Sequence, residues 1–383
     1  MDLNLTDSQE QVRELAARFA RERILPGARQ RDRQEQFPFE LLREMAALGL
    51  MGINVPAEYG GAAAGAVAYA LAMMEVSAAC ASTSVAMAVT NMCAELICRF
   101  GTAEQKTQHV RRLVSGEAGP GAFALSEPHS GSDAAALTTR AERRGQRWVL
   151  NGSKQWITSG AYAGVLIVWA RTGESGSRGI SAFIVEGGTP GLKVGKHEDK
   201  LGLRASNTVA LTFENCEIPQ ENLLAAEGDG FKLAMSALDG GRIGIASQGC
   251  GVASAALEAS LSYSKERTAF GARIAEFQAI RWFLANIATD LSAARALTLR
   301  AASRKERGQP FTKEASMAKL FASEMAYRAC DRAVQIHGGY GYVDEFPVER
   351  YLRDARVQTL YEGTSEIQRL VIAREVLKEA ATF

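Results

Sequence analysis

Hydrophobic positions in the first part of the chain recur at helical spacing. Thr6 and Gln9 form the pattern of a capping box, and the apolar positions that follow predict a helix that ends at Pro26. The pattern predicts four further helices, from near Pro38 to Gly49, over about 64–81, over about 83–100, and from Thr102 to about Leu113. The two middle segments are apolar almost all round, which predicts that they are buried within a bundle.

The pattern changes near Gly116. From there to about residue 225, glycines and turn pairs separate short β-branched or aromatic runs, of which the clearest are 147–150, 165–169, 182–185 and 208–213. The pair Asn151-Gly152 is expected to form a turn. Strands and helices do not alternate in this region, so the sequence predicts an antiparallel sheet or barrel and not a Rossmann domain.

Helical periodicity returns after Gly230, with long segments near 231–264, 273–306 and 313–337 and shorter ones near 345–354 and 365–379. The order helices, β-structure, helices predicts an α+β fold. We expect an N-terminal helical domain (1–115), a central antiparallel, β-barrel-like domain (116–228) and a C-terminal helical bundle domain (229–383). The seams between such domains are common places for ligands.

Composition argues against several classes of function. Lys and Arg total 44 against 43 Asp and Glu, a formal net charge of +1, so nothing favours nucleic acid or an acidic membrane surface. No apolar run reaches 18 residues, which predicts no membrane span. The opening Met1-Asp2-Leu3-Asn4 lacks the basic start of a secretory signal, so we expect a cytoplasmic protein. Six cysteines and four histidines are scattered, so we expect no metal site.

Two segments of the central region have the residue types of a ligand-binding loop. Phe123–Asp133 combines Ser126, Ser130 and Ser132 with a Pro-led turn, which suits backbone N–H groups and hydroxyls that meet a polar ligand. Asn151–Thr158 places Trp156 beside the hydroxyl of Thr158. On composition alone, an ordinary loop and a core tryptophan are the more common interpretations.

Three segments of the C-terminal region carry charges or glycines in helical surroundings. Arg242 could hold a substrate or form a structural salt bridge with Asp239, and spacing alone leaves both open. The stretch 267–271, with Gln278 beyond it, is compatible with phosphate binding. The glycines of 335–342 allow a ligand to approach the backbone closely, but they follow a helix, so a nicotinamide-binding motif is excluded.

Glu362 stands between Tyr361 and Gly363, just before a helix that Thr364 or Ser365 can cap. Loss of solvation beside an aromatic ring raises the pKa of a carboxyl group and suits it to act as a base near neutral pH. In isolation, a surface glutamate in a connection is the more common interpretation.

Together, in this order and spacing, these segments resemble the acyl-CoA dehydrogenase family over essentially the whole chain. The stretches 361–368 (YEGTSEIQ) and 339–354 (GYGYVDEFPVERYLRD) are the most specific, and 241–248 (GRIGIASQ) is similar to short-chain members. The resemblance implies an N-terminal helical domain, a central β-domain and a C-terminal four-helix bundle, with FAD between the last two.

The resemblance also implies roles for individual residues. Glu362 is expected to be the catalytic base. Expected FAD contacts are Phe123, Leu125, Ser126, Ser132, Trp156, Ile157, Thr158, Thr364 and Glu366, and, across a subunit boundary, Arg267, Phe270, Gln278, Gln335, Gly338 and Gly339. Expected contacts with the CoA ester are Ser132, Asp239, Arg242, Tyr361, Gly363 and Arg374. No residue is expected to bind a metal.

The implied reaction is α,β-dehydrogenation of a short- to medium-chain acyl-CoA to the trans-2-enoyl-CoA, as in fatty acid β-oxidation. Glu362 would remove the α-proton while the β-hydrogen leaves as hydride to flavin N5. A subset of the family carries its base on an earlier helix, at the position of Gly241. Glycine cannot serve as a base, so the resemblance places the base at Glu362.

The resemblance implies an electron-transfer flavoprotein as electron acceptor and a homotetramer, a dimer of dimers. Two other enzymes of the same fold stay open: a flavin oxidase, and a dehydrogenase of acyl groups on a carrier protein. A non-enzymatic scaffold is the alternative from another class, and the presence of Glu362 and Arg242 argues against it.

Overall fold

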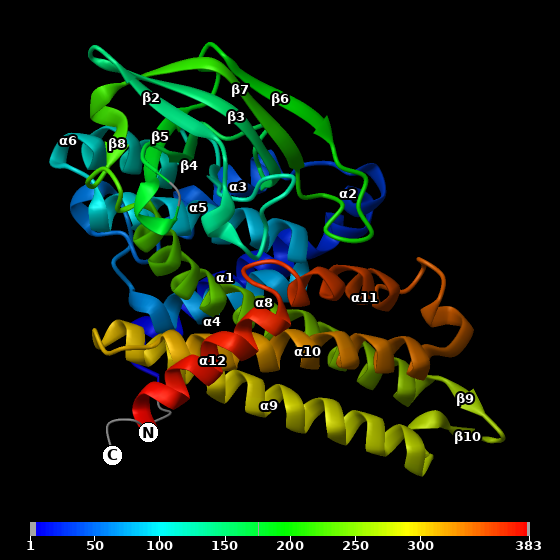
Figure 1. Cartoon of the computed structure of the whole chain (residues 1–383). Helices are drawn as coiled ribbons and strands as arrows, with labels where there is room; N and C mark the ends of the chain where they lie inside the picture. The colour runs from blue at the N-terminus through cyan, green and yellow to red at the C-terminus, as the bar shows by residue number, and fades with distance from the viewer. Residues whose placement is uncertain (1–4, 175, 381–383) are drawn as a thin grey trace.

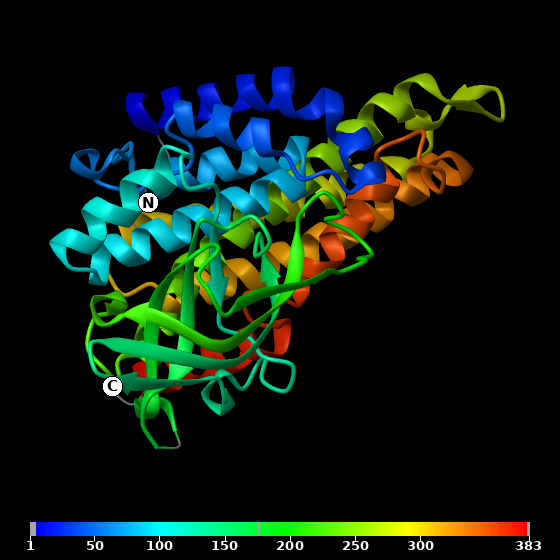
Figure 2. The same cartoon turned by 90° about the horizontal axis from the view of Figure 1, so that it is seen from above.

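The computed structural model describes residues 5–174 and 176–380. The opening four residues, on which the expectation of no secretory signal was based, lie outside this range. Figure 1 shows N-terminal helices, a central sheet region and C-terminal helices, which is the predicted three-domain α+β architecture. Seen from above, the sheet covers one side of a broad layer of helices (Figure 2).

The N-terminal region is helical up to Val114. Its elements are α1 (Asp7–Phe19), η1 (Ala20–Ile24), η2 (Leu25–Gly27), α2 (Ala28–Gln34), α3 (Phe39–Ala47), η3 (Ala57–Tyr59), α4 (Gly65–Ala79), α5 (Ala81–Phe100), α6 (Ala103–Gln105), η4 (Lys106–Val110) and α7 (Arg111–Val114). The capping boxes at Thr6 and Thr102 are both present. The predicted stop at Pro26 was wrong, because this proline lies in the first turn of η2, where its missing N–H costs nothing.

The central region is a sheet of eight strands in the order β6-β7-β3-β2-β4-β5-β8, with β1 beside β4. The strands are β1 (Gly121–Ala124), β2 (Arg140–Arg144), β3 (Arg147–Thr158), β4 (Val165–Arg171), β5 (Ile180–Glu186), β6 (Leu192–His197), β7 (Thr208–Pro219) and β8 (Leu223–Leu224), with short helices η5 (Ala134–Ala136), η6 (Ser177–Gly179) and η7 (Gln220–Asn222) between them.

Two expectations for the sheet need correction. The sheet is mixed and not purely antiparallel, because β1 runs parallel to β4, with Gly121 paired to Val165. Asn151-Gly152 does not form a turn but lies inside β3, where the pairing with β7 shifts between Leu150 and Gly152. A β-bulge places the glycine in a permissive backbone conformation, which a local turn rule cannot distinguish from a hairpin.

The C-terminal region comprises α8 (Gly230–Glu266), β9 (Thr268–Ala269), β10 (Ala272–Arg273), η8 (Ile274–Glu276), α9 (Gln278–Glu306), α10 (Thr312–His337), η9 (Gly338–Gly341), α11 (Val348–Arg356), η10 (Val357–Thr359) and α12 (Ser365–Ala380). The second long helix begins at Gln278 and not near 273, since 272–276 form β10 and η8. In Figure 1, α12 lies across α10.

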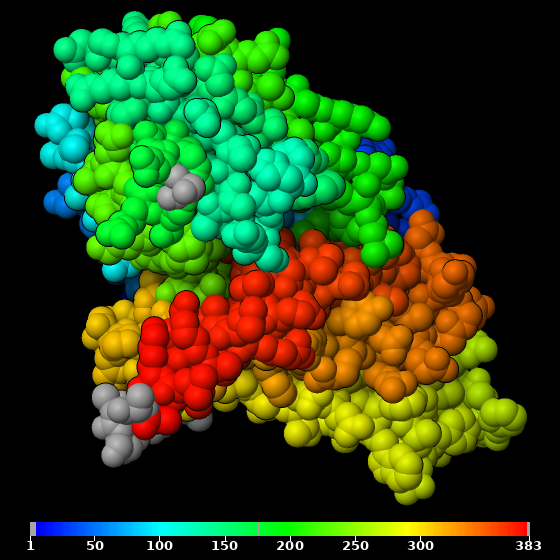
Figure 3. Space-filling view, in the orientation of Figure 1, coloured from blue at the N-terminus to red at the C-terminus, as the bar shows by residue number. Residues whose placement is uncertain are grey.

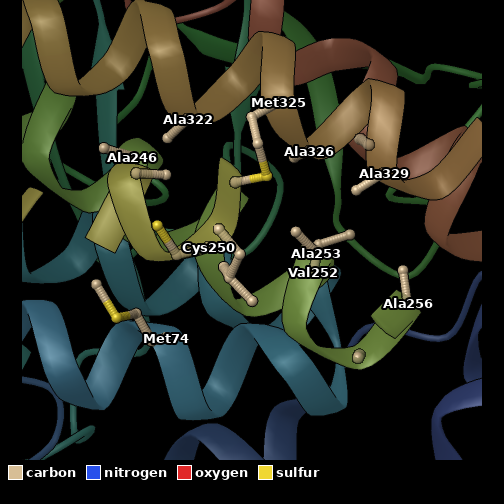
Figure 4. Close-up of a cluster of buried hydrophobic side chains, with 14 of the residues drawn as sticks. Met74, Ala246, Cys250, Val252, Ala253, Ala256, Ala322, Met325, Ala326 and Ala329 are labelled. Carbon is tan, nitrogen blue, oxygen red and sulfur yellow. The ribbon is translucent and has the colours of Figure 1, made fainter. Parts of the chain in front are cut away.

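Helix α8 is the centre of the helical core. It packs against α10 on one side and α4 on the other (Figure 4). Small side chains such as Ala253 and Ala326 allow this close approach, and a Cβ on Gly251 would lie 2.2 Å from the carbonyl oxygen of Met74. This packing fixes the position of the Asp239–Arg242 segment, which lies on the same helix.

Helix α5 has the length and apolar composition of a membrane span, but 89% of that window is buried inside the fold. It contacts α4, α8 and β1. These contacts explain its uniformly apolar surface as that of an internal helix.

Candidate active site

Glu362 lies in the connection between η10 and α12, in a left-handed backbone conformation. Its φ is +54° and that of Gly363 is +87°, so two successive residues occupy the left-handed region. The Oγ1 of Thr364 accepts the N–H of Ile367 at 3.3 Å and caps α12, as predicted. In Figure 3 the surface of the central region meets the red C-terminal segment along a seam, and Glu362 belongs to the connection that leads into that segment.

The carboxyl group of Glu362 is enclosed by helices. Although the residue as a whole is partly exposed, its Oε2 is inaccessible and has no hydrogen-bond partner in residues 5–174 and 176–380. A Cβ on Gly241 would lie 2.6 Å from that oxygen and 3.2 Å from the sulfur of Met92. Burial raises the pKa of Glu362 to about 7, although the cations Arg242 and Lys319 oppose the shift.

Arg242 forms the ion pair that spacing left open. It is 4% exposed, and its Nη1 donates to Asp239 Oδ1 at 2.6 Å and to Ser316 Oγ at 3.3 Å. Its Nε is buried without a partner in the described residues. Burial raises the pKa of Asp239. The arrangement is a preorganised cation with one donor to spare, which can bind an acceptor on a ligand.

A pocket adjoins the carboxyl group between α4, α5, α8 and α9. Its lining includes Tyr69, Met92, Gly241, and the ion pair of Glu95 with Lys305, whose atoms are 2.6 Å apart. Gly241 and Met92 belong both to this lining and to the surroundings of Glu362. The pocket and the carboxyl group are therefore separated by no more than these two shared neighbours.

The two loops expected to contact FAD are tied together by a buried ion pair. Lys154 Nζ donates to Glu127 Oε1 at 2.8 Å and to the carbonyl oxygen of Leu125 at 3.2 Å, and both charged side chains are at most 1% exposed. Glu127 also accepts the N–H groups of Thr138 and Thr139. These bonds lower the pKa of Glu127 to about 2. The first loop therefore has a fixed position relative to β3.

The exposed ring of Trp156 shows that these loops suit a flat cofactor. A second bulge in β3 places Trp156 at φ +63° with 62% of its surface exposed, while Ile157 is buried. The N–H of Gln155 donates to the carbonyl oxygen of Ser126 at 2.9 Å. An aromatic ring turned outward by strained backbone, beside a hydroxyl-bearing loop, fits a ring system that stacks on it.

Not all predicted contacts of that loop are equivalent. Phe123 is half-buried and packs on Trp169 at 4.2 Å between ring centroids, and Leu125 is buried. Ser126 and Thr158 are partly exposed, and Ser132 is exposed. The hydroxyl groups of this loop are therefore accessible to a ligand. Phe123 and Leu125 instead pack inside the fold and support the loop.

The residues expected to act across a subunit boundary lie away from Glu362 in the chain's own fold. Arg267, Phe270 and Gln278 lie on or beside the β9–β10 hairpin at one end of the molecule (Figure 1), and Phe270 is 100% exposed. Arg267 lies 5.5 Å from the ring centre of Tyr340, which follows Gly338 and Gly339. Gln335 and both glycines are exposed.

The remaining predicted contacts lie in the connection that holds Glu362 and on α12. The Tyr361 hydroxyl donates to Gln248 Oε1, and Gly363 is partly exposed. Thr364 is partly exposed and Glu366 exposed at the start of α12. Arg374 is exposed and pairs with Glu375 at 2.9 Å.

Three buried polar residues that support the site were not predicted from the sequence: Lys154, Lys319 and Gln368. Lys319 is fully buried and donates to the carbonyl oxygen of Gly363 at 2.6 Å. A lone lysine among Ala315 and Ala322 on one helical face was the available signal. The ion pair of Lys154 had no such signal, since its partner lies 27 residues away.

Comparison with known proteins gives matches over nearly the whole chain. The three models for acyl-CoA dehydrogenase, namely its N-terminal, middle and C-terminal domains, match residues 6–117, 122–216 and 228–377. The mouse protein "short-chain specific acyl-CoA dehydrogenase, mitochondrial" is 49% identical over 378 residues, which are 98% of this chain and 92% of the mouse protein.

Solved structures agree with these matches. Butyryl-CoA dehydrogenase from Megasphaera elsdenii superposes with a TM-score of 0.96 at 42% identity, over 98% of this chain and 100% of that one. A chain from a structure of the electron transferring flavoprotein of Acidaminococcus fermentans gives a TM-score of 0.97 at 44% identity, with the same coverage.

Proposed function

The chain belongs to the acyl-CoA dehydrogenase family of FAD-dependent oxidoreductases, and from this premise we propose that it converts a short- to medium-chain acyl-CoA to the trans-2-enoyl-CoA. The observation that carries the proposal is the Glu362 carboxyl group. Its buried Oε2 lies against Gly241, and its pKa is raised to about 7. A base with this pKa is half ionised near neutral pH, which suits removal of a weakly acidic α-proton.

The chain's own residues would prepare the substrate for this step. The pocket beside Gly241 and Met92 receives the acyl chain, so the α-carbon faces Glu362. Backbone N–H of Glu362 donates to the thioester oxygen and stabilises the developing enolate, as in the family. Exclusion of water from this enclosed site strengthens that hydrogen bond. Bound FAD supplies the acceptor for the β-hydride.

The proposed FAD contacts are those of the two loops and the start of α12. Trp156 and the Ser126 hydroxyl support a flavin ring at the seam, and Thr364 and Glu366 lie at the start of α12, in the C-terminal region beyond that seam. Arg242 and Asp239 are the proposed contacts of the CoA ester, through the unpartnered Nε of the arginine. The proposed domain limits are 1–115, 116–228 and 229–383.

We also propose a homotetramer that passes its electrons to an electron-transfer flavoprotein. The fully exposed Phe270 and its neighbours on the β9–β10 hairpin are the residues expected to complete the FAD site of another subunit. The similarity to a chain from a structure of an electron transferring flavoprotein supports the acceptor. We propose a cytoplasmic location.

The test of the proposed function is an anaerobic visible spectrum of the FAD-loaded protein before and after addition of butyryl-CoA. Bleaching of the flavin band is the expected result. A band that stays unchanged with butyryl-CoA but bleaches with a longer or carrier-bound acyl group would change the proposed substrate but not the proposed reaction. A protein that binds no flavin would overturn the proposal. Rapid reoxidation by air, without an electron-transfer protein, would favour the oxidase alternative.

Gly241→Ala is expected to slow flavin reduction by roughly 10- to 100-fold. The new methyl group would lie 2.6 Å from Glu362 Oε2, so the carboxyl group must move. Alanine is the better helix former, so helix propensity would not explain a slower reaction. Stopped-flow absorbance after mixing with butyryl-CoA measures the rate.

Ser262→Ala, on the same helix, is the control for that variant. Ser262 is exposed and its hydroxyl donates to the exposed Glu266, so the rate should stay within about twofold of the parent rate. Equal rates for Gly241→Ala and Ser262→Ala would contradict the placement of Glu362 against Gly241.

A further inference from the structure

Lys319 is a buried cation that is hydrogen-bonded to the residue next to the proposed base. It lies on α10 with no exposed surface, and its Nζ donates to the carbonyl oxygen of Gly363, the residue after Glu362, at 2.6 Å. It forms no ion pair with any carboxylate that the structure describes. A fully buried lysine without a carboxylate partner costs stability, so its presence calls for a compensating role.

A second donor holds the same stretch of backbone. Gln368 Nε2 donates to the carbonyl oxygens of Glu362 and Gly363 at 3.0 and 2.9 Å. Both of these residues are in the left-handed region, which is unfavourable for a glutamate. The hydrogen bonds from Lys319 and Gln368 oppose relaxation of this strained pair.

The two donors differ in charge, and a positive charge beside Glu362 affects the ionisation of its carboxyl group. The ionisable groups coupled to the Glu362 carboxyl group are Arg242 on α8, Lys319 on α10, Tyr69 on α4, Cys93 on α5 and the adjacent Tyr361. The two cations favour the ionised carboxylate, and both tyrosines and the thiol are neutral because burial raises the pKa of each. The charge of Arg242 is already shared with Asp239, 2.6 Å away. Lys319 faces a neutral carbonyl, so its field is not cancelled by an ion pair.

We propose that Lys319 is a positioning residue for the reaction, which holds the Glu362–Gly363 backbone in place and favours the ionised form of the Glu362 carboxyl group. This inference rests on the proposed function, in which Glu362 is the base. Burial lowers the pKa of Lys319 to about 8, so its amine still carries a proton at pH 7.

Loss of the Lys319 charge should raise the pKa of Glu362, because this cation opposes the effect of burial. At pH 7 the ionised fraction would then fall, so flavin reduction should slow by roughly fivefold. The difference should disappear near pH 9, where the carboxyl group of the variant is ionised again.

Lys319→Met and Gln368→Leu form the test pair, each made in the full chain and loaded with FAD. Flavin reduction by butyryl-CoA is measured between about pH 6 and pH 9. Lys319→Met should shift the midpoint of the pH profile upward. Gln368→Leu removes an uncharged donor from the same carbonyls, so it should slow the reaction equally at every pH. A Lys319→Met profile that falls uniformly, like that of Gln368→Leu, would overturn the proposal.

A titration without substrate separates this inference from the proposed function. The infrared carboxyl band of Glu362, obtained as the difference from Glu362→Gln, reports the ionisation of that group directly. An upward shift in Lys319→Met supports the inference, and an unchanged midpoint overturns it, even if no acyl-CoA reduces the flavin of the parent chain. Lys319→Gln, which removes the charge and keeps a donor, takes the place of Lys319→Met if the latter does not fold.

Discussion

Glu362→Gln is expected to retain FAD and to reduce its flavin with butyryl-CoA about 10²–10⁴-fold more slowly than the parent chain. The amide has nearly the same shape as the carboxyl group that faces Gly241, but it cannot accept the α-proton. The measurement is anaerobic stopped-flow absorbance, with the flavin content of each protein determined first.

The same assignment gives the pH dependence of the parent chain. Because the pKa of Glu362 is raised to about 7, flavin reduction should increase with pH below that value and level off above it. Glu142→Gln, which removes an exposed carboxylate on β2, should leave both rate and pH profile unchanged. Normal turnover by Glu362→Gln would remove Glu362 from the mechanism.

Lys154→Met is expected to lower the free energy of unfolding by about 3–5 kcal/mol and to weaken FAD binding. The substitution leaves Glu127 ionised and buried, with two backbone N–H groups in place of its cation. It also removes the hydrogen bond from β3 to Leu125 in the first loop. Urea unfolding of the FAD-free protein and titration with FAD measure the two effects.

Lys193→Met is the matched control on the same sheet. Its ion pair with Glu214 is exposed on both sides, so its loss should cost less than about 1 kcal/mol and leave FAD binding intact. The double variant Glu127→Gln with Lys154→Met should recover part of the stability, since no charge is then left buried. Equal destabilisation by Lys154→Met and Lys193→Met would show that the buried pair does not support the loop.

Local rules predicted the helices well where a cap or an apolar face defines them. The capping boxes at Thr6 and Thr102 and the cap at Thr364 are present because each depends on residues within one helical turn. Pro26 and Asn151-Gly152 were interpreted wrongly for the opposite reason. Each of these short sequences is compatible with two local backbone structures, and contacts from distant segments select between the two.

The residues of the candidate site also fall into those that the sequence identified and those that it could not. Glu362, Arg242 and Trp156 were identified through segments that resemble a family, and not through composition, which favoured ordinary roles for two of them. Lys154 and Lys319 could not be identified, because a lysine is buried only when the fold supplies a partner from elsewhere in the chain. For the same reason, the role of Gly241 as the wall beside the base needed coordinates.

The position of α8 between α4 and α10 affects how the chain can fold during synthesis. Helix α4 ends at Ala79, but the helix that covers its apolar side begins only at Gly230, after the whole sheet has been made. The first hundred residues therefore leave the ribosome with an uncovered apolar surface, for which chaperones are the usual remedy. Hydrogen exchange should accordingly find α4 and α8 protected as one cooperative unit, although 150 residues separate the two helices in the chain.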